Sequence, residues 1–271
     1  MTTAQRSASH NSNSAYFAGA DVGASRTKVV IIDAEGFMVG YHVDRSGTDF
    51  TATADHCLAE ALAMANIEKD QILRTISTGY GRKNVSYAHD HRTEISCHGK
   101  GCFHYYPFAI TIIDIGGQDN KIIKLDDTGR RTAFKMNRKC AAGTGAFLEE
   151  MSPRLDIPLS EMNDLAAAST DMVKLGSFCT VFSATEVLEN IRRGKRVEDI
   201  VKGLFFSVIS RIKEMDAFTE KVVMTGGVVA HNPYLVEMTQ ELINRPILVP
   251  VLPQFTGALG AALYARETHG D

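Results

Sequence analysis

Two glycine-framed aspartate turns constrain the fold of this chain more than any other feature. The first turn occupies residues 19–28 (GADVGASRTK) and the second occupies residues 114–119 (DIGGQD). An apolar strand is predicted to run into each turn, and a second strand, another turn and a third strand follow it. The same order of elements therefore occurs twice. This recurrence predicts an α/β chain with two similar domains rather than a short solenoid repeat.

Hydrophobic periodicity in the rest of the chain supports this plan. Short apolar runs bounded by turn residues indicate strands, and apolar residues at offsets of three and four indicate helices. We predict strands at residues 16–20, 28–33, 37–43, 75–78, 109–113, 121–125, 131–136 and 221–225. We predict helices at residues 51–66, 197–218 and 256–266, another that contains residues 185–193, and one that Pro233 opens.

The composition limits the class of protein. A chain of 271 residues is long enough for two packed domains, and its formal net charge of -3 argues against general binding to nucleic acid or to an anionic membrane. No apolar run reaches the roughly 18 residues of a membrane helix. Residues 1–15 are expected to be a disordered tail, because the segment is polar and has no apolar signal core. Five cysteines without a C-x-x-C spacing indicate a reducing, cytoplasmic location.

A carboxylate that ends a strand beside a glycine turn suits a nucleotide site. Asp21 and Asp114 can hold Mg²⁺ through water or orient an attacking water, and Gly23 lets the backbone approach phosphate oxygens. Two ordinary hairpins with Asp-Gly turns are the alternative interpretation, and the chain has no P-loop motif. We predict catalytic roles for Asp21, Asp114 and Gln118, and nucleotide contacts for Gly23, Ala24, Ser25, Thr27, Lys28, Gly116, Gly117 and Asp119.

Two cysteines that follow the second turn have the sequence context of reactive thiols. Cys140 and Cys179 each stand just ahead of a predicted helix, where the N-terminal N–H groups favour a thiolate. Two thiolates are half of the four that an all-cysteine iron–sulfur cluster takes, and a two-fold dimer would supply the other half. Two buried free cysteines are the alternative. Cys57, Cys97 and Cys102 are predicted to pack in the interior.

The turns resemble the phosphate motifs of the acetate kinase, sugar kinase, heat-shock-70 and actin superfamily. Residues 224–228 (MTGGV) resemble its adenosine motif, and residues 94–101 and 256–265 occupy the places of its two interdomain helices. The resemblance implies a two-domain, actin-like (ribonuclease H-like) ATPase fold with a nucleotide cleft between the domains. The implied limits are residues 16–108, completed by the helix at 256–268, for the N-terminal domain and 109–255 for the C-terminal domain.

The segment around each cysteine narrows the resemblance to one branch. The sequences CAAGTG from Cys140 and CTVF from Cys179, with Glu186 nearby, are similar to the BadF/BadG/BcrA/BcrD-type ATPases. These are activators of 2-hydroxyacyl-CoA dehydratases and ATPase subunits of benzoyl-CoA reductases. The resemblance implies ATP and Mg²⁺, with one [4Fe–4S] cluster held between two subunits by Cys140 and Cys179 of each. Further nucleotide contacts are expected at Gly143, Gly145, Glu186, Gly226 and Gly227.

The same resemblance implies a set of partners. The chain would form a homodimer, or a heterodimer with a related ATPase subunit, and would take electrons from a ferredoxin or flavodoxin. It would pass one low-potential electron at a time to an iron–sulfur dehydratase or reductase component. A small-molecule kinase of the same fold, acting on a sugar or carboxylate without a cluster, is the alternative function. The basic run at residues 192–196 is expected to be a solvated surface or a docking site for an acidic partner.

Overall fold

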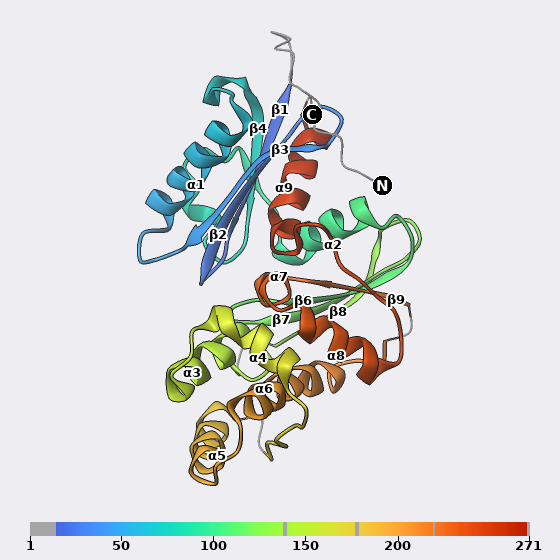
Figure 1. The fold of residues 1–271 in the computed structure, drawn as a ribbon. Helices are drawn as coiled ribbons and strands as arrows, with labels where there is room; N and C mark the ends of the chain where they lie inside the picture. Colours follow the sequence, from blue (N-terminus) through green and yellow to red (C-terminus); the bar gives the residue numbers. More distant parts are fainter. Residues whose placement is uncertain (1–14, 138–139, 177–178, 219, 270–271) are drawn as a thin grey trace.

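The strands of the chain form two five-stranded sheets, which lie one above the other in Figure 1. The computed structural model describes residues 15–137, 140–176, 179–218 and 220–269, so the expected tail lies outside the described residues except for its last position. The N-terminal sheet has the order β3-β2-β1-β4-β5, with β1 (Tyr16–Val22), β2 (Arg26–Ile32), β3 (Met38–Arg45), β4 (Ile72–Thr78) and β5 (Asp90–His91). The C-terminal sheet has the order β10-β9-β6-β7-β8, with β6 (Ile110–Ile115), β7 (Asn120–Leu125), β8 (Arg131–Asn137), β9 (Lys221–Thr225) and β10 (Ile247–Leu248).

The two sheets repeat one topology down to the register of individual residues. Strand β1 pairs antiparallel with β2 and parallel with β4, and β6 pairs antiparallel with β7 and parallel with β9. Asp21 faces Lys28 across the first hairpin, and Asp114 faces Lys121 across the second. The predicted recurrence of strand, acidic turn and strand is therefore confirmed. The predicted domain limits stay a prediction.

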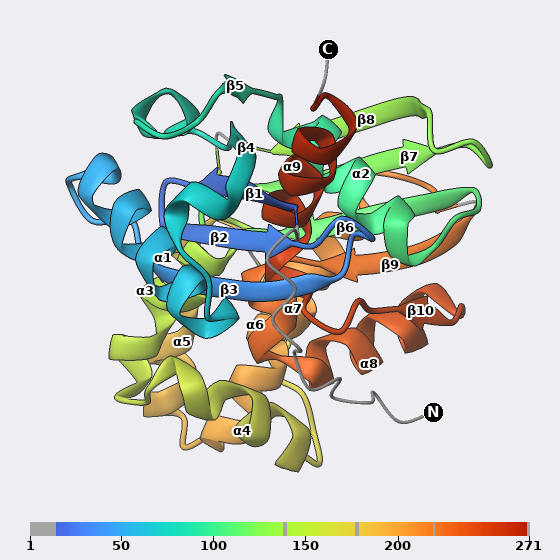
Figure 2. The same ribbon diagram turned by 90° about the horizontal axis from the view of Figure 1, so that it is seen from above.

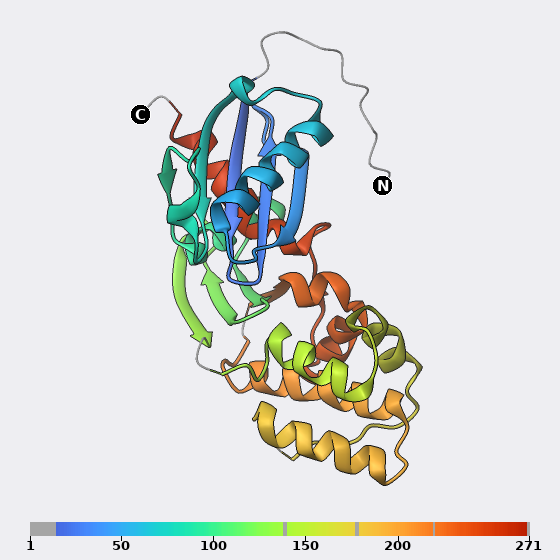
Figure 3. The same cartoon turned by 90° about the vertical axis from the view of Figure 1, so that its left-hand side faces the viewer.

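Helices cover both faces of the N-terminal sheet (Figures 2 and 3). On one face, Ala18 and Ala20 of β1 pack with the buried side of α1 (Phe50–Ala65). On the other face, Phe17 packs with α9 (Thr256–Glu267). Because both faces are buried, the strands are apolar over most of their length. The last helix of the chain thus packs on the sheet that the first strands form.

Helix α2 (Glu94–Tyr105) crosses α9 between the two sheets, and small residues allow the close approach. A Cβ atom at Gly101 would lie 2.1 Å from the carbonyl oxygen of Thr256. A Cβ atom at Gly260 would lie 1.8 Å from the carbonyl oxygen of Cys97. Neither position has room for a side chain, so these glycines bring the two helices into backbone contact. Cys97 and Cys102 are fully buried at this crossing, as predicted.

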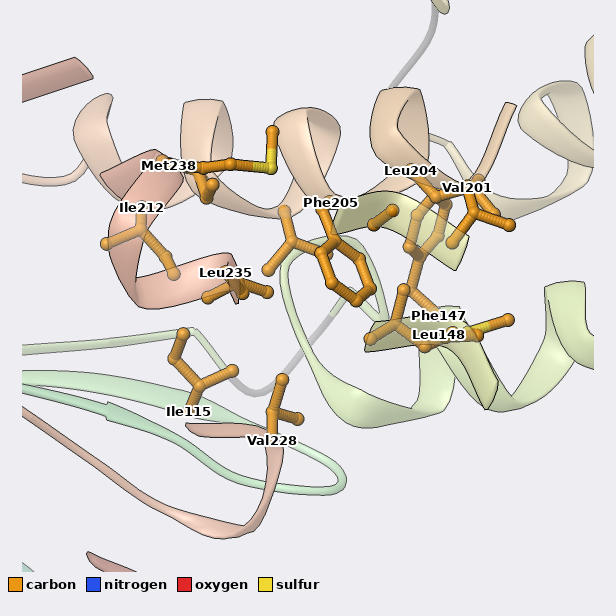
Figure 4. Close-up of a cluster of buried hydrophobic side chains, with 14 of the residues drawn as sticks. Ile115, Phe147, Leu148, Val201, Leu204, Phe205, Ile212, Val228, Leu235 and Met238 are labelled. Carbon is orange, nitrogen blue, oxygen red and sulfur yellow. The ribbon is translucent and has the colours of Figure 1, made fainter. Parts of the chain in front are cut away.

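The largest hydrophobic core lies between the C-terminal sheet and the helices that cover one of its faces (Figure 4). Phe205 of α6 (Val197–Lys213) points toward Phe147 of α3 and Leu235 of α8, and Ile115 and Val228 close the core from the side of the sheet. Helix α6 lies between the sheet and α5 (Figures 1 and 3). The remaining helices of this half are α3 (Gly145–Leu155), α4 (Met162–Ala168), α5 (Thr180–Arg192), α7 (Gly227–His231) and α8 (Pro233–Ile243).

Most expected elements are present with shifted ends. Strand β2 begins at Arg26 rather than at residue 28, so Arg26 and Thr27 belong to the strand as well. Helix α5 begins at Thr180, directly after Cys179, and α6 ends at Lys213 rather than at residue 218. Helix α4 was not predicted, because its seven residues are too few to display helical periodicity. Among the described residues, no helix has the length and apolar character that crossing a membrane requires.

Candidate functional site

The two aspartate turns meet where the ends of the two sheets face each other. A Cβ atom at Gly117, in the second turn, would lie 2.7 Å from Oγ of Ser25 in the first turn. The backbone of one turn is therefore in contact with a side chain of the other. Ala24 and Gln118, at the tips of the two turns, are exposed. The structure thus brings both predicted phosphate turns to one place, although they come from different sheets.

Asp21, the last residue but one of β1, is a buried carboxylate with one unpaired oxygen. Its Oδ2 atom lies 3.3 Å from Nζ of Lys28, and its Oδ1 atom has no hydrogen-bond partner among the described residues. Thr27 is fully buried, and its hydroxyl pairs with Oγ of Ser46 at 2.9 Å. Ser46 Oγ also donates to the carbonyl of Gly23. These bonds brace the first turn from behind. The unpaired Oδ1 of Asp21 is buried, and a bound cation or water would satisfy it.

Asp114 occupies the equivalent position, last but one in β6, and belongs to a larger charge network. Nζ of Lys121 lies 3.0 Å from Asp114, 2.6 Å from Asp119 and 2.8 Å from Glu94, and the side chain of Lys121 is only 2% exposed. Burial favours the neutral lysine, but the three carboxylates outweigh it and raise the pKa of Lys121 well above its usual value. Sequence reasoning missed Lys121 and Glu94. The signal that could have found Lys121 is its spacing from Asp114, which equals the spacing of Lys28 from Asp21.

The pKa of Asp114 follows from the same network. Burial alone would raise it, but the charges of His98 and Lys121 outweigh burial and lower the pKa to about 2. Nδ1 of His98 lies 3.7 Å from Oδ1 of Asp114 and 3.1 Å from the hydroxyl of Thr256. That Oδ1 atom has no hydrogen-bond partner among the described residues. Asp114 is therefore a stable anion, and its free oxygen is of the hard donor type that Mg²⁺ and its bound waters take.

The glycine pair after β9 forms the third part of the cleft. Gly226 has φ +103°, and its N–H donates to the carbonyl of Pro253 at 3.0 Å. A Cβ atom at Gly226 would lie 2.3 Å from the carbonyl oxygen of Ile115, so only glycine fits beside the second turn. A Cβ atom at Gly227 would meet no described atom within 4 Å. The backbone at Gly227 is thus open to a ligand.

The segment that carries Cys140 is hydrogen-bonded to the second turn. The N–H groups of Gly145 and Ala146, at the start of α3, donate to the carbonyls of Gly116 and Gly117 at 2.9 and 2.7 Å. Nδ2 of the buried Asn120 donates to the carbonyl of Gly143 at 2.9 Å. These three hydrogen bonds join the second turn and the start of β7 to the segment that carries Cys140. The predicted residues Gly143 and Gly145 lie in this joint.

Cys140 and Cys179 are exposed, and the segments that carry them meet. Their neighbours Ala141 and Thr180 line one groove of about 470 Å³ between α3 and α5. Cys179 is the residue that caps the N-terminus of α5. Glu186, predicted as a nucleotide contact, accepts a hydrogen bond from the N–H of Gly176 at 2.6 Å. Gly176 shortly precedes Cys179 in the chain. Residues 138–139 and 177–178, which directly precede Cys140 and Cys179, lie outside the described residues.

The other three cysteines differ from this pair. Burial raises the pKa of the Cys57 thiol to about 11 and that of Cys97 to about 12, and it raises the pKa of Cys102 still further. All three are protonated at neutral pH and are fully buried. Their predicted packing role is confirmed. Exposed thiols close to a shared groove suit metal binding, whereas the buried thiols do not.

Two sheets of one topology, with acidic turns facing each other at their ends, define an actin-like ATPase fold. A ROK family glucokinase from Streptomyces griseus has this fold with a TM-score of 0.55 at 13% identity, over 93% of this chain and 99% of its own. Beyond the fold, the sequence also matches a family: residues 18–265 match the model of the BadF/BadG/BcrA/BcrD ATPase family. The chain belongs to this family.

Relatives within the family are similar over nearly their whole length. An activator of lactoyl-CoA dehydratase from Anaerotignum propionicum is 43% identical over 255 residues, which are 93% of this chain and 98% of the relative. The crystal structure of component A of the Acidaminococcus fermentans (R)-2-hydroxyglutaryl-CoA dehydratase gives a TM-score of 0.90 at 37% identity, over 95% of this chain and 100% of its own. The activator of the 2-hydroxyisocaproyl-CoA dehydratase from Clostridium difficile, with bound ADPNP, gives a TM-score of 0.87 at 40% identity, over 93% and 94%.

A relative from the benzoyl-CoA branch is less similar. One of the subunits of the benzoyl-CoA reductase from Thauera aromatica is 26% identical over 265 residues, which are 93% of each chain. The difference in identity places this chain nearer to the dehydratase activators than to that reductase.

Proposed function

We propose that this protein is an ATP-hydrolysing electron donor that activates a 2-hydroxyacyl-CoA dehydratase. The observation that carries the proposal is the joint between the second turn and the segment of Cys140, made by Gly145 and Ala146 on the carbonyls of Gly116 and Gly117. A change at the phosphates can reach the exposed cysteines through this joint. The identity of 43% to a dehydratase activator favours a dehydratase system over a benzoyl-CoA reductase.

The proposed nucleotide site lies between the two turns. Asp21 and Asp114 would hold Mg²⁺ through water or orient the attacking water, and each has one free carboxylate oxygen for this task. The exposed side chain of Gln118 would assist at the γ-phosphate. Phosphate contacts are proposed for Gly23, Ala24, Ser25, Thr27, Lys28, Gly116, Gly117 and Asp119, and contacts with the rest of the nucleotide for Gly143, Gly145, Glu186, Gly226 and Gly227.

The proposed metal centre is a [4Fe–4S] cluster shared by two copies of the chain. Each copy offers Cys140 and Cys179 at one exposed groove, and four thiolates are needed. When bound, such a cluster supplies one-electron chemistry at low potential. A ferredoxin or flavodoxin would provide the electron, and the dehydratase component would accept it. The chain's own part is to couple closure at the two turns to movement of α3 and of the cysteine segment.

The kinase alternative does not account for the cysteines. A sugar or carboxylate kinase has no need of two exposed thiols beside one groove, and the joint to the second turn would have no task. The family relatives that share 37 to 43% of this sequence are described as dehydratase activators or components and not as kinases. These observations support the electron-transfer function.

Iron analysis tests the cluster. We expect anaerobically reconstituted protein to be a brown dimer with about two iron atoms per chain, since a shared cluster of four gives each copy half. Cys140→Ala and Cys179→Ala should each lose the iron yet keep nucleotide affinity. Cys57→Ala is the matched control, because Cys57 is buried and lies on α1, and this variant should keep the iron. Colourless, monomeric wild-type protein after reconstitution would overturn the proposal.

A further inference from the structure

Three side chains with metal-binding chemistry meet at the outer edge of the N-terminal sheet. His42 and Asp44 stand two residues apart on the edge strand β3, so they lie on one face of it. Gly40 belongs to the same face, and a Cβ atom there would lie 2.2 Å from the carbonyl oxygen of Ala61 in α1. The glycine lets α1 approach β3 closely, and this approach brings His56 of α1 to the two strand residues.

The three ligand atoms converge. One nitrogen from each histidine and one oxygen of Asp44 all lie within 4.8 Å of one another. Nε2 of His56 is 3.8 Å from Oδ2 of Asp44, and the two imidazole rings meet edge to face with centroids 5.6 Å apart. Bonds of about 2.0–2.2 Å to a central ion place ligand atoms roughly 3–3.5 Å apart. Small side-chain rotations would bring the three ligand atoms from their present separations to those distances.

One oxygen of the Asp44 carboxylate is held by a hydrogen bond, and the other points toward His56. Oδ1 of Asp44 accepts a hydrogen bond from the N–H of Arg45 at 2.6 Å, which orients the group, while Oδ2 faces His56. The side chains of Asp44 and His56 are 47% and 53% exposed, so water can complete the coordination. The neighbouring Cys57 is fully buried, and its thiol faces the carbonyl of Thr27 instead.

We propose that His42, Asp44 and His56 form a binding site for a divalent transition-metal ion, with Zn²⁺ as the expected occupant. Two imidazoles and one carboxylate suit Zn²⁺, whereas Mg²⁺ and Ca²⁺ take oxygen ligands. The Mg²⁺ that accompanies ATP therefore does not compete for this site. The bound ion ties the edge strand β3 to α1. None of the three ligand residues belongs to the proposed nucleotide site or to the groove between α3 and α5.

Metal titration of the iron-loaded protein tests the site. We expect one Zn²⁺ per chain in addition to the iron. In the cluster-free double variant Cys140→Ser/Cys179→Ser, Co²⁺ in the same place should give weak visible bands without a sulfur-to-cobalt charge-transfer band. His42→Ala and His56→Ala should each weaken Zn²⁺ binding at least about tenfold. His91→Ala is the matched control, because this exposed histidine lies on β5 outside the cluster, and it should bind Zn²⁺ like the wild type.

Two further measurements keep the result decisive. The double variant Cys140→Ser/Cys179→Ser should still bind one Zn²⁺, which separates this site from the exposed thiols and from any failure of cluster assembly. Zn²⁺ should raise the melting temperature of the wild type but not that of the folded histidine variants. No Zn²⁺ bound to the double cysteine variant, or equal affinity in the wild type and both histidine variants, would overturn the proposal.

Discussion

Replacing Asn120 by alanine tests the joint between the second turn and the cysteine segment. The variant loses the 2.9 Å bond from Nδ2 to the carbonyl of Gly143, and Asn120 is only 1% exposed. Leaving a buried carbonyl without its donor costs about 1–3 kcal/mol. That energy corresponds to a change of about 5- to 150-fold in the equilibrium between docked and open segment. The two backbone bonds of Gly145 and Ala146 remain, so the segment should open more often without unfolding the domain.

Hydrogen exchange measures this opening directly. In Asn120→Ala, the amides of Gly145 and Ala146 should exchange about 5- to 150-fold faster, because they are protected by their bonds to the second turn. A non-hydrolysable ATP analogue should add protection to both amides in the wild type and less in the variant. The measurement needs no cluster, so it stands apart from the iron experiment.

Asn232 provides the matched control. It is also buried, its Nδ2 donates to the carbonyl of Val228 at 2.8 Å, and its Oδ1, like that of Asn120, has no hydrogen-bond partner in the part of the chain that the structure describes. Asn232→Ala should therefore cost similar stability while leaving exchange at Gly145 unchanged. Wild-type exchange rates in Asn120→Ala, or nucleotide protection equal in both proteins, would refute the reasoning.

Three further predictions concern the two aspartates and Lys121. Asp21→Ala and Asp114→Ala should keep the iron but lose ATP hydrolysis by at least about a hundredfold, and phosphate-release assays with near-wild-type turnover would remove them from the catalytic site. Lys121→Met should cost about 3–5 kcal/mol of unfolding free energy, because it leaves a buried cluster of carboxylates without its cation; denaturant titration measures the loss, and wild-type stability would contradict it. The pKa of Asp114, lowered from 3.8 to about 2 in the folded state, contributes about 2 kcal/mol of stability that is present above pH 4 and lost as the pH falls toward 2; the acid limb of a stability–pH curve should be shallower in Asp114→Asn.

The strands and both turns were predictable from the amino-acid sequence, because their signals are local. An apolar run that ends in Asp followed by glycine marks a strand and its turn without reference to the rest of the chain. The repeated order of elements predicted two similar domains, and the structure has two sheets of one topology. Element ends were less predictable, since Arg26 and Thr27 extend β2 beyond its predicted start at residue 28 by pairing with β3 and β1.

The cysteines show where local signals stop. The sequence singled out Cys140 and Cys179 by motif and placed them ahead of helices, and both are exposed. It did not reveal that their segments line one groove, or that Gly145 donates to the second turn. Such contacts depend on how α3 and α5 pack on the sheet.

The amino-acid sequence by itself determined the chemistry present: two acidic turns and two cysteines beside helix starts. Tertiary structure alone decided which of these groups meet. Packing of the elements placed the buried Lys121 among three carboxylates. The close approach of α1 at Gly40 brought His56 to the strand that carries His42. The physical reason is that short-range propensity acts over a few residues, whereas charge networks and ligand sets form between elements that only packing brings together.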